Sequence, residues 1–443
     1  MELPSAFLNA MQTLLGEEYP SFLECWQGTA HRGLRRNPLK CGEAQLRDAL
    51  PFPIEPTAFS PLSYRFNAGE EGVGRLPAHH AGLFYVQEPS ACSAVTALDP
   101  QPGERVLDLC AAPGGKSTQI AGLLGGEGLL WSNEIVKSRA QILLSNVERL
   151  GVRNAVVSSC RPQRLCEGLQ GFFDRVLVDA PCSGEGMFRR DPAAVSQWTP
   201  ESPAACAQRQ RAILDSAALA VKEGGVLTYS TCTFAKEENE DNVEWFLAAH
   251  PEFELVPLEL PFGRPGVNGL PVRRIYPMDG GEGHFVAKFR RVGENPCYAG
   301  SFAGTLPPRE VGEARQLFEE LFTVPFPEEV ARFGDRLLLL PPGLPELSGL
   351  GVLRAGVEFA RQKGRRLEPS HAVFQAARKE ECRQSMDLPW DAPALAAFLH
   401  GEEIDCDGKG YVAVCAGGVP TGFGKASGGR LKNHYPKGLR LLS

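Results

Sequence analysis

The stretch that decides the fold runs from Val106 to Thr118 and reads VLDLCAAPGGKST. It begins as an apolar run, passes through small residues that include Gly114 and Gly115, and continues into a helical pattern. Glycines at such a turn let the backbone approach a ligand closely. A strand, a glycine loop and a helix in this order are typical of an α/β unit that binds a nucleotide or a cofactor.

Two kinds of site use a loop of this type. A phosphate-binding P-loop would end in Gly115-Lys116-Ser117, but it needs a further glycine at a position that Cys110 occupies here. The alternative is a site for a dinucleotide or for S-adenosylmethionine, in which a carboxylate about 20 residues further on accepts the ribose hydroxyls. Glu134 stands at that distance, after the next apolar run. The sequence therefore favours the second kind of site.

On both sides of this loop, apolar runs alternate with helical stretches from about residue 81 to residue 292. Strands separated by helices predict βαβ units and a mostly parallel sheet. Ligands of such sheets bind outside the carboxyl ends of the strands. The strands are expected at Arg105–Cys110, Gly128–Ser132, Asn154–Ser158, Asp174–Asp179, Gly225–Thr231 and His284–Phe289.

The chain holds 13 cysteines. No two of them have the Cys-x-x-Cys spacing of a zinc ribbon, and the stretch Met1 to Gly16 lacks the basic start of a secretory signal. We therefore expect a cytoplasmic protein whose thiols stay free, because the cytoplasm is a reducing compartment. Most of these cysteines are expected to pack as small buried side chains.

Two cysteines directly follow predicted strands: Cys182, within Asp179-Ala-Pro-Cys-Ser-Gly184, and Cys232, within Thr231-Cys-Thr-Phe234. Both would lie at the carboxyl edge of the sheet, where a thiol can be exposed and activated. Methylation of cytosine carbon 5 explains such a pair. A thiolate that adds to carbon 6 makes carbon 5 nucleophilic, and the second thiol can assist release of the first. Asp179 is placed to stabilise the charge that develops on the ring.

Three motifs, in this order along the chain, resemble the RsmB/RsmF/NSUN family of RNA cytosine-5 methyltransferases. They are Cys110-Ala-Ala-Pro-Gly-Gly-Lys116, Asp179-Ala-Pro-Cys-Ser-Gly184 and Thr231-Cys-Thr-Phe234. The resemblance extends upstream to Tyr85-Val-Gln-Glu-Pro-Ser90. The tail, with Lys425, Leu431-Lys-Asn433 and Tyr435-Pro-Lys-Gly438, is similar to the PUA-like RNA-binding domain of the RsmF type.

The resemblance implies a role for each matching residue. Cys232 would be the nucleophile and Cys182 would promote product release. DNA cytosine methyltransferases use the thiol of the Pro-Cys motif instead, so a reversed assignment stays open. The family usually has Asp or Glu after the third strand, where this chain has Cys160. The cofactor would be S-adenosylmethionine, held by Cys110, Ala111, Ala112, Pro113, Gly114, Gly115, Lys116, Glu134 and Asp179.

The resemblance also implies the architecture. We expect an α/β fold with a Rossmann-like class I S-adenosylmethionine-dependent methyltransferase core, an N-terminal α+β domain and a C-terminal PUA-like, β-rich RNA-binding domain. The acidic window Arg309–Asp335 predicts a small helical segment or linker between the last two. The expected units are residues 1–80 (N-terminal RNA-binding or substrate domain), 81–292 (catalytic), 293–365 (linker or first C-terminal domain) and 366–443 (PUA-like).

RNA is the implied partner, most specifically small-subunit (16S) ribosomal RNA or the 30S subunit. The net charge of −7 excludes a protein that is basic throughout, but a local basic face suffices for RNA. The cluster His31–Arg36 is one candidate face. No apolar run approaches the roughly 18–20 residues that a membrane span needs. We expect a monomer that uses neither a membrane nor a metal.

Two alternatives stay open: a cytosine-5 methyltransferase of transfer RNA, and a noncatalytic RNA-binding factor in ribosome assembly that keeps a relic fold. A relic fold is opposed by the presence of all the residues expected to act in catalysis, which are Cys182, Cys232 and Asp179. The target base must be unpaired or flipped out for a thiol to reach carbon 6. The side chains that could stack on it are Phe188, Trp198 and Phe234, although each is more often part of a core.

Overall fold

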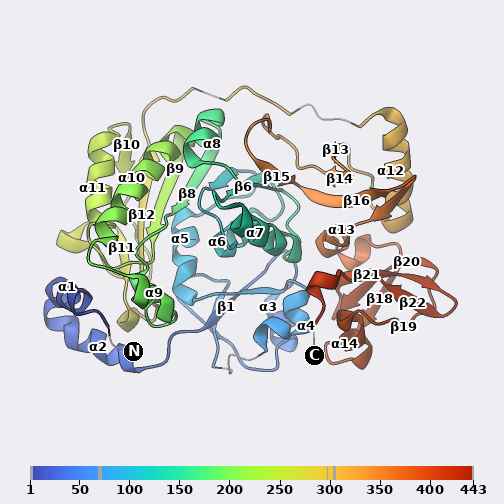
Figure 1. The fold of residues 1–443 in the computed structure, drawn as a ribbon, viewed down its shortest axis with the longest axis horizontal. Coiled ribbons are helices and arrows are strands. Elements are labelled where there is room, and N and C mark those ends of the chain that lie inside the picture. The colour runs from blue at the N-terminus through green and yellow to red at the C-terminus, as the bar shows by residue number, and fades with distance from the viewer. Residues whose placement is uncertain (1–2, 68–71, 297, 303–305, 442–443) are drawn as a thin grey trace.

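The computed structural model describes residues 3–67, 72–296, 298–302 and 306–441. A large central sheet occupies the middle, and the C-terminal units, drawn in orange and red, lie on the right of Figure 1. Helices α1 and α2 lie at the opposite lower corner (Figure 1). Cys297 is outside the described residues. Among the helices that are described, none has the length and apolar character needed to cross a membrane.

The central sheet has the strand order β10-β12-β9-β8-β5-β6-β7-β15, with β11 paired to β12. Strands β9, β8, β5, β6 and β7 are parallel, which confirms the predicted βαβ arrangement. Their carboxyl ends therefore share one edge. The strands are β5 (Arg105–Asp108), β6 (Leu129–Asn133), β7 (Ala155–Ser158), β8 (Phe173–Asp179), β9 (Val221–Thr231), β10 (Phe253–Leu255), β11 (Arg273–Ile275), β12 (His284–Arg291) and β15 (Val352–Ala355).

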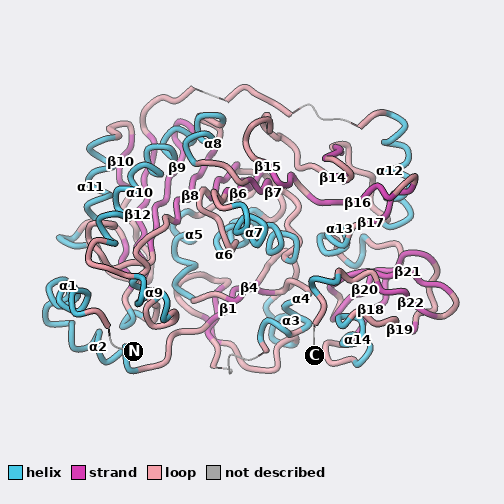
Figure 2. Tube along the Cα trace, in the orientation of Figure 1, coloured by secondary structure: helices cyan, strands magenta, loops and turns pink. Residues whose placement is uncertain are grey.

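Alternate side chains of these strands bury against helices on the two faces of the sheet. Leu107 and Trp131 pack with α8, α10 and α11 on one face, and Val106 and Leu130 pack with α5, α6 and α7 on the other. Figure 2 shows these helices on either side of the strands. The helices are α5 (Ser93–Leu98), α6 (Gly115–Leu124), α7 (Lys137–Arg149), α8 (Pro162–Gly168), α9 (Pro192–Gln197), α10 (Ser202–Ala220) and α11 (Glu240–Ala249).

The N-terminal unit is a four-stranded antiparallel sheet of order β2-β3-β1-β4 with four helices. Phe7 and Phe22, on its first two helices, pack against Phe188 and Phe234 of the catalytic unit. Phe188 and Phe234 are therefore core residues and are not free to stack on a base. The elements are β1 (Gly33–Arg36), β2 (Glu55–Pro56), β3 (Ser63–Arg65), β4 (Phe84–Val86), α1 (Ser5–Leu15), α2 (Tyr19–Gln27), α3 (Glu43–Asp48) and α4 (Pro77–His80).

The acidic window Arg309–Asp335, expected to be a small helical segment or linker, is helical over its first half, and the residues beyond it form a small sheet. After α12 (Pro308–Leu321) come four antiparallel strands in the order β13-β14-β16-β17, while β15 joins the edge of the central sheet beside β7. The helical expectation is confirmed by α12, whereas the strands beyond it were not predicted. The strands are β13 (Val330–Phe333), β14 (Arg336–Leu339), β16 (Val357–Lys363) and β17 (Arg366–Pro369).

The C-terminal unit is a five-stranded sheet of order β18-β20-β21-β22-β19, which agrees with the expected β-rich domain. Phe374 of α13 stacks on Phe423 of this sheet, so the two C-terminal units share a core. The elements are α13 (His371–Ala376), α14 (Pro393–His400), β18 (Ser385–Leu388), β19 (Ile404–Asp405), β20 (Gly410–Ala416), β21 (Val419–Ser427) and β22 (Arg430–Asn433).

Candidate active site

The glycine loop between β5 and α6 needs both of its glycines. Gly114 has φ +116°, a conformation that other residues rarely adopt. A side chain at Gly115 would place its Cβ 2.9 Å from Oε1 of Gln87. The loop therefore packs closely against the N-terminal unit and keeps its backbone open toward the edge of the sheet.

A cavity of about 580 Å³ lies at the carboxyl edge of the parallel strands. It brings together most of the predicted site residues: Cys110, Ala111, Ala112, Pro113, Gly115, Lys116, Asp179 and Cys232. Gly114, Glu134 and Cys182 lie next to it in the fold but do not line it. The catalytic and cofactor motifs thus meet at the edge that the strand pattern predicted.

Asp179, at the end of β8, is held from two sides. Lys116 Nζ lies 2.7 Å from Asp179 Oδ2, and the Ser230 hydroxyl donates a hydrogen bond of 2.8 Å to Oδ1. Burial opposes the charge of Lys116, but attraction to Asp179 outweighs it and raises the pKa of the lysine. The pair presents a fixed carboxylate and an ammonium group to the cavity.

Cys182 and Cys232 meet across the two loops that follow β8 and β9. Their sulfur atoms lie 3.2 Å apart, and the backbone N–H of Cys232 donates to Cys182 Sγ at 3.4 Å. Both thiols are free. The hydrogen bond with Cys232, burial and the charge of Cys232 together raise the pKa of Cys182 well above its usual value. Cys182 therefore stays protonated at neutral pH and can donate its proton toward Cys232.

Two buried carboxylates tie these loops together, and sequence reasoning missed both. Glu185, in the Cys182 loop, accepts hydrogen bonds of 3.0 Å from the Thr233 hydroxyl and from the Phe234 backbone N–H. Glu238, beyond Cys232, accepts from the Ser183 backbone N–H at 3.0 Å and from the Ser183 hydroxyl. Burial raises the pKa of Glu185 to about 7 and also raises that of Glu238. We call these crossed contacts the cross-brace.

The far wall of the cavity comes from segments that the catalytic motifs do not include. Glu88 accepts from the backbone N–H of Ser90 at 2.8 Å, and the Ser90 hydroxyl lies 2.9 Å from His284 Nδ1. Burial raises the pKa of Glu88 to about 7 and lowers that of His284 to about 3. The Tyr85–Ser90 motif indicated part of this wall, but no sequence pattern indicated that His284 belongs to the site.

Arg35 is the one charged residue of the cluster His31–Arg36 that the structure removes from the candidate face for RNA. It is fully buried, and its guanidinium donates to the Gly115 carbonyl at 3.0 Å and to the Thr118 hydroxyl at 2.6 Å. These hydrogen bonds tie β1 to the first turn of α6, so the Arg35 guanidinium is not available to a phosphate.

The cofactor side of the site lies around β5, β6 and β7. Asp108 Oδ2 accepts from the Ser117 hydroxyl at 2.7 Å, but its buried Oδ1 has no partner. Burial raises the pKa of Asp108 to about 7. Glu134 is 3% exposed and accepts from the Val136 backbone N–H at 2.9 Å. The backbone N–H of Cys160 donates to Asn133 Oδ1 at 3.0 Å, and Asn133 Nδ2 donates to the Cys160 carbonyl at 3.0 Å.

Four protein families together match most of this chain. The family described as 16S rRNA methyltransferase RsmB/F matches residues 95–290. Three families that describe parts of RsmF match the N-terminal domain at 3–89, the first C-terminal domain at 317–376 and the PUA domain at 386–441.

Curated relatives match along the whole chain. Ribosomal RNA small subunit methyltransferase F of Escherichia coli O17:K52:H18 is 32% identical, covering 98% of this chain and 96% of the relative. The protein of the same name from Cronobacter sakazakii is 31% identical, covering 99% and 96%. The chain belongs to the RsmF family of 16S rRNA methyltransferases.

Solved structures agree with the fold of this RsmF-family enzyme. A methyltransferase homolog from Pyrococcus horikoshii is 30% identical, with a TM-score of 0.57, and covers 64% of this chain and 94% of that one. NSun6 from Pyrococcus horikoshii, crystallised with SFG, has a TM-score of 0.59 at 23% identity and covers 66% and 99%. The second likeness supports the fold alone.

The enzyme is an S-adenosylmethionine-dependent methyltransferase, and its residues fit that cofactor. The unpartnered Asp108 Oδ1 offers a buried acceptor beside the glycine loop, as the ammonium group of a methionine moiety requires. Glu134 ends the neighbouring strand with a buried carboxylate, which suits ribose hydroxyls. The loop itself lines the cavity from Cys110 to Pro113 and at Gly115 and Lys116, so a ligand there would lie against its backbone.

Proposed function

We propose that this RsmF-family enzyme transfers a methyl group from S-adenosylmethionine to carbon 5 of a cytosine in small-subunit ribosomal RNA. One observation carries the proposal: two free thiols, 3.2 Å apart, lie at the end of the cavity that holds the Lys116–Asp179 pair. Cytosine carbon 5 needs covalent activation before it can accept a methyl group, and this arrangement provides it.

We assign the nucleophile to Cys232, which lines the cavity. Its sulfur forms a bond to carbon 6, and the electron pair displaced from the ring develops negative charge toward N3. Asp179 is assigned to that side of the ring, where its carboxyl group can carry the proton that N3 takes up, while the Lys116 ammonium beside it offsets the developing charge. S-adenosylmethionine supplies the electrophilic methyl group that carbon 5 attacks.

Release then requires a base, assigned to solvent that enters the cavity, to take the proton on carbon 5. The electrons of that bond re-form the double bond between carbons 5 and 6, and the electron pair of the bond between sulfur and carbon 6 returns to Cys232. The Cys182 thiol, held in its protonated form, can stabilise the departing sulfur across 3.2 Å. We therefore assign product release to Cys182. The cofactor contacts are assigned to Asp179, Glu134 and the loop from Cys110 to Lys116.

RNA is the macromolecular partner of the enzyme, as its family and its PUA domain indicate. We propose that the RNA is 16S rRNA, free or within the 30S subunit, because the curated relatives are named for the small subunit. We also propose that the enzyme acts as a monomer in the cytoplasm, where catalytic thiols stay reduced.

The test is methyl transfer from radiolabelled S-adenosylmethionine to purified RNA. Label should enter small-subunit rRNA or the 30S subunit and not transfer RNA, and bisulfite sequencing should place it on cytosine carbon 5. Label on transfer RNA alone would favour a tRNA methyltransferase. If a folded sample transfers no label to any RNA, the proposal is wrong.

A further inference from the structure

His284, the first residue of β12, lies beside the nucleophile without a role in the reaction described so far. Strand β12 runs antiparallel to β9, and Phe285 pairs with Thr231, so the next position of the register places His284 opposite Cys232. The His284 side chain is 7% exposed and lines the catalytic cavity. A buried histidine at this position can touch the base that Cys232 attacks.

One ring nitrogen of His284 is tied to the segment that begins at Glu88. The Ser90 hydroxyl lies 2.6 Å from Glu88 Oε2 and 2.9 Å from His284 Nδ1. Above its pKa of about 7, Glu88 is a carboxylate and can only accept, so the Ser90 hydroxyl donates its single proton to Glu88. The Ser90 oxygen is then left to accept a hydrogen bond from Nδ1–H of His284.

The other ring nitrogen is therefore an acceptor. Burial and the charges of Lys116 and Arg190 lower the pKa of His284 to about 3, so its ring carries a single proton at neutral pH. With that proton on Nδ1, Nε2 offers a lone pair. In the described part of the chain, Nε2 has no hydrogen-bond partner, and it is not sealed from solvent. The cavity thus receives an unused acceptor at this point.

The charged side chains around this acceptor do not duplicate it. Those that act on the His284 ring are Lys116, Asp179 and Arg190, and the two cations among them can only donate. Glu282 also lines the cavity, but it is 1% exposed and paired with an arginine. His284 and Asp179 are therefore the neighbouring groups that can accept from the polar edge of a base.

Asp179 alone does not distinguish cytosine from uracil. Opposite N3, its carboxylate can accept from the N3–H of uracil, and its protonated form can donate to N3 of cytosine. The two bases also differ at position 4, which carries an amino group in cytosine and a carbonyl oxygen in uracil. Position 4 lies between N3 and carbon 5, so a group beside Asp179 and opposite Cys232 is placed to meet it.

We infer that Nε2 of His284 accepts a hydrogen bond from the 4-amino group of the target cytosine, and that Ser90 and Glu88 act as positioning residues that hold the ring in this tautomer. Uracil would bring a second acceptor against Nε2, and both would stay unpaired. A site built to bind one polar group rejects the analogue that lacks it. The inference rests on the proposed function, because it takes a cytosine as the target.

The test uses RNA fragments that carry an altered base at the cytosine located by bisulfite sequencing. One fragment has 5-fluorocytidine there, and the other has the riboside of 5-fluoro-2-pyrimidinone, which lacks only the 4-amino group. Fluorine cannot leave as a proton, so the covalent adduct persists in the presence of S-adenosylmethionine, and denaturing gels measure how fast it forms. The assay runs at about pH 8, above the pKa of Glu88.

The preference for the amino-bearing base is the measured quantity, because the intrinsic reactivities of the two rings cancel when proteins are compared. The wild type should prefer that base about tenfold more strongly than His284→Phe does, the effect of one lost hydrogen bond. Ser90→Ala, which frees the tautomer, should give an intermediate preference. His400→Phe is the matched control and should keep the preference of the wild type, since His400 lies in α14, outside the cavity.

His284→Gln gives a result that a misfolded variant cannot produce. Its amide can accept from the amino group of cytosine or, turned over, donate to the carbonyl oxygen of uracil. It should therefore form the adduct with 5-fluorouridine faster than the wild type does.

Two results would overturn the inference while the proposed function stands. One is an equal preference for the amino-bearing base in the wild type and His284→Phe. The other is normal formation of the adduct by His284→Phe with slow release of methylated RNA, which would make His284 the base for the carbon-5 proton. If the wild type forms no adduct and methylates no RNA, the proposed function fails and the inference fails with it.

Discussion

Cys182 and Cys232 lie 3.2 Å apart, yet only Cys232 lines the catalytic cavity. Cys182 is set back behind it and is held protonated by its neighbour and by burial. The assignment of the two roles therefore depends on position and on proton occupancy, because the side chains are chemically the same.

The first prediction separates the two thiols. Cys232→Ala should abolish methyl transfer and any covalent RNA adduct, because no other thiol lines the cavity at that point. Cys182→Ala should still form the adduct and release it slowly, so that protein linked to RNA accumulates. Denaturing gels with labelled RNA and S-adenosylmethionine measure this. An adduct formed by Cys232→Ala would reverse the assignment.

The second prediction concerns the cofactor. Glu134→Ala should weaken binding of S-adenosylmethionine by about tenfold, the cost of losing one or two hydrogen bonds to a charged group. Calorimetric titration of the free enzyme measures it without RNA. Glu127→Ala is the control, since Glu127 is exposed in the turn just before the same strand. Equal affinity in wild type and Glu134→Ala would remove Glu134 from the site.

At the scale of elements, the cross-brace sets the distance between the catalytic loops. Each loop sends a carboxylate into the backbone of the other, and the hydroxyls of Ser183 and Thr233 lie 2.8 Å apart between them. Glu185 and Glu238 touch no cavity atom, so they act as positioning residues through Cys182 and Cys232. Their burial makes the arrangement rigid, since neither carboxylate can turn toward water.

The third prediction tests the cross-brace. Glu238→Gln and Glu185→Gln should each lower kcat by roughly 10- to 100-fold, because a shift of about 1 Å between reacting groups has that effect. KM for RNA and the affinity for S-adenosylmethionine should not change. The rate at which iodoacetamide alkylates Cys232 should change as well, and a merely structural role would leave it unaltered. Glu223→Gln, at an exposed site in β9, is the matched control. Unchanged kcat in both test variants would contradict the positioning role.

The sequence predicts the elements better than it predicts the contacts between them. The parallel strands are predicted from short, continuous apolar runs, because a strand that helices cover on both faces carries apolar side chains on both. Glu185, Glu238 and Arg35 were missed or misread because an isolated charged residue usually marks a solvated surface. Their partners lie as much as 83 residues away along the chain, and local pattern holds no information about them.

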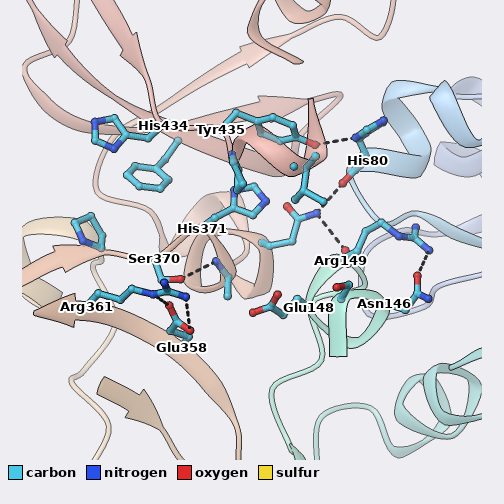
Figure 3. A pocket seen from close by; sticks show the side chains of 18 of the residues that line it. His80, Asn146, Glu148, Arg149, Glu358, Arg361, Ser370, His371, His434 and Tyr435 are labelled. Carbon is cyan, nitrogen blue, oxygen red and sulfur yellow. Dashed lines mark hydrogen bonds and ion pairs between the residues drawn. The ribbon is translucent and has the colours of Figure 1, made fainter. Parts of the chain in front are cut away.

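At the scale of the whole molecule, partly buried histidines lie where the units meet. His79 and His80 of α4 and His371 of α13 all line a cavity of about 780 Å³ at this meeting point (Figure 3). Burial lowers the pKa of His79 to about 3 and that of His80 and His371 to about 4. The assembled molecule therefore holds them neutral, whereas an unfolded chain would protonate them below about pH 6.5.

The fourth prediction follows from this difference. A histidine with a lowered pKa in the folded state contributes stability above about pH 6.5 and loses it as the pH falls toward 4. Relative to His371→Phe, the wild type should lose up to about 1.4 kcal/mol of unfolding free energy per pH unit in that window. Denaturant titrations from pH 4.5 to 7.5 measure it. His400→Phe should follow the wild type. Parallel curves for His371→Phe and the wild type would show that His371 is not held neutral.

Strand β15, contributed from beyond residue 350, covers the edge of the central sheet by pairing with β7. Without it, β7 would expose a row of unpaired backbone groups, which is the kind of edge on which chains associate and aggregate. The catalytic unit is therefore not a free-standing module. Cut after residue 292, it should express poorly or self-associate, so attempts to minimise this enzyme should keep the strand that seals it.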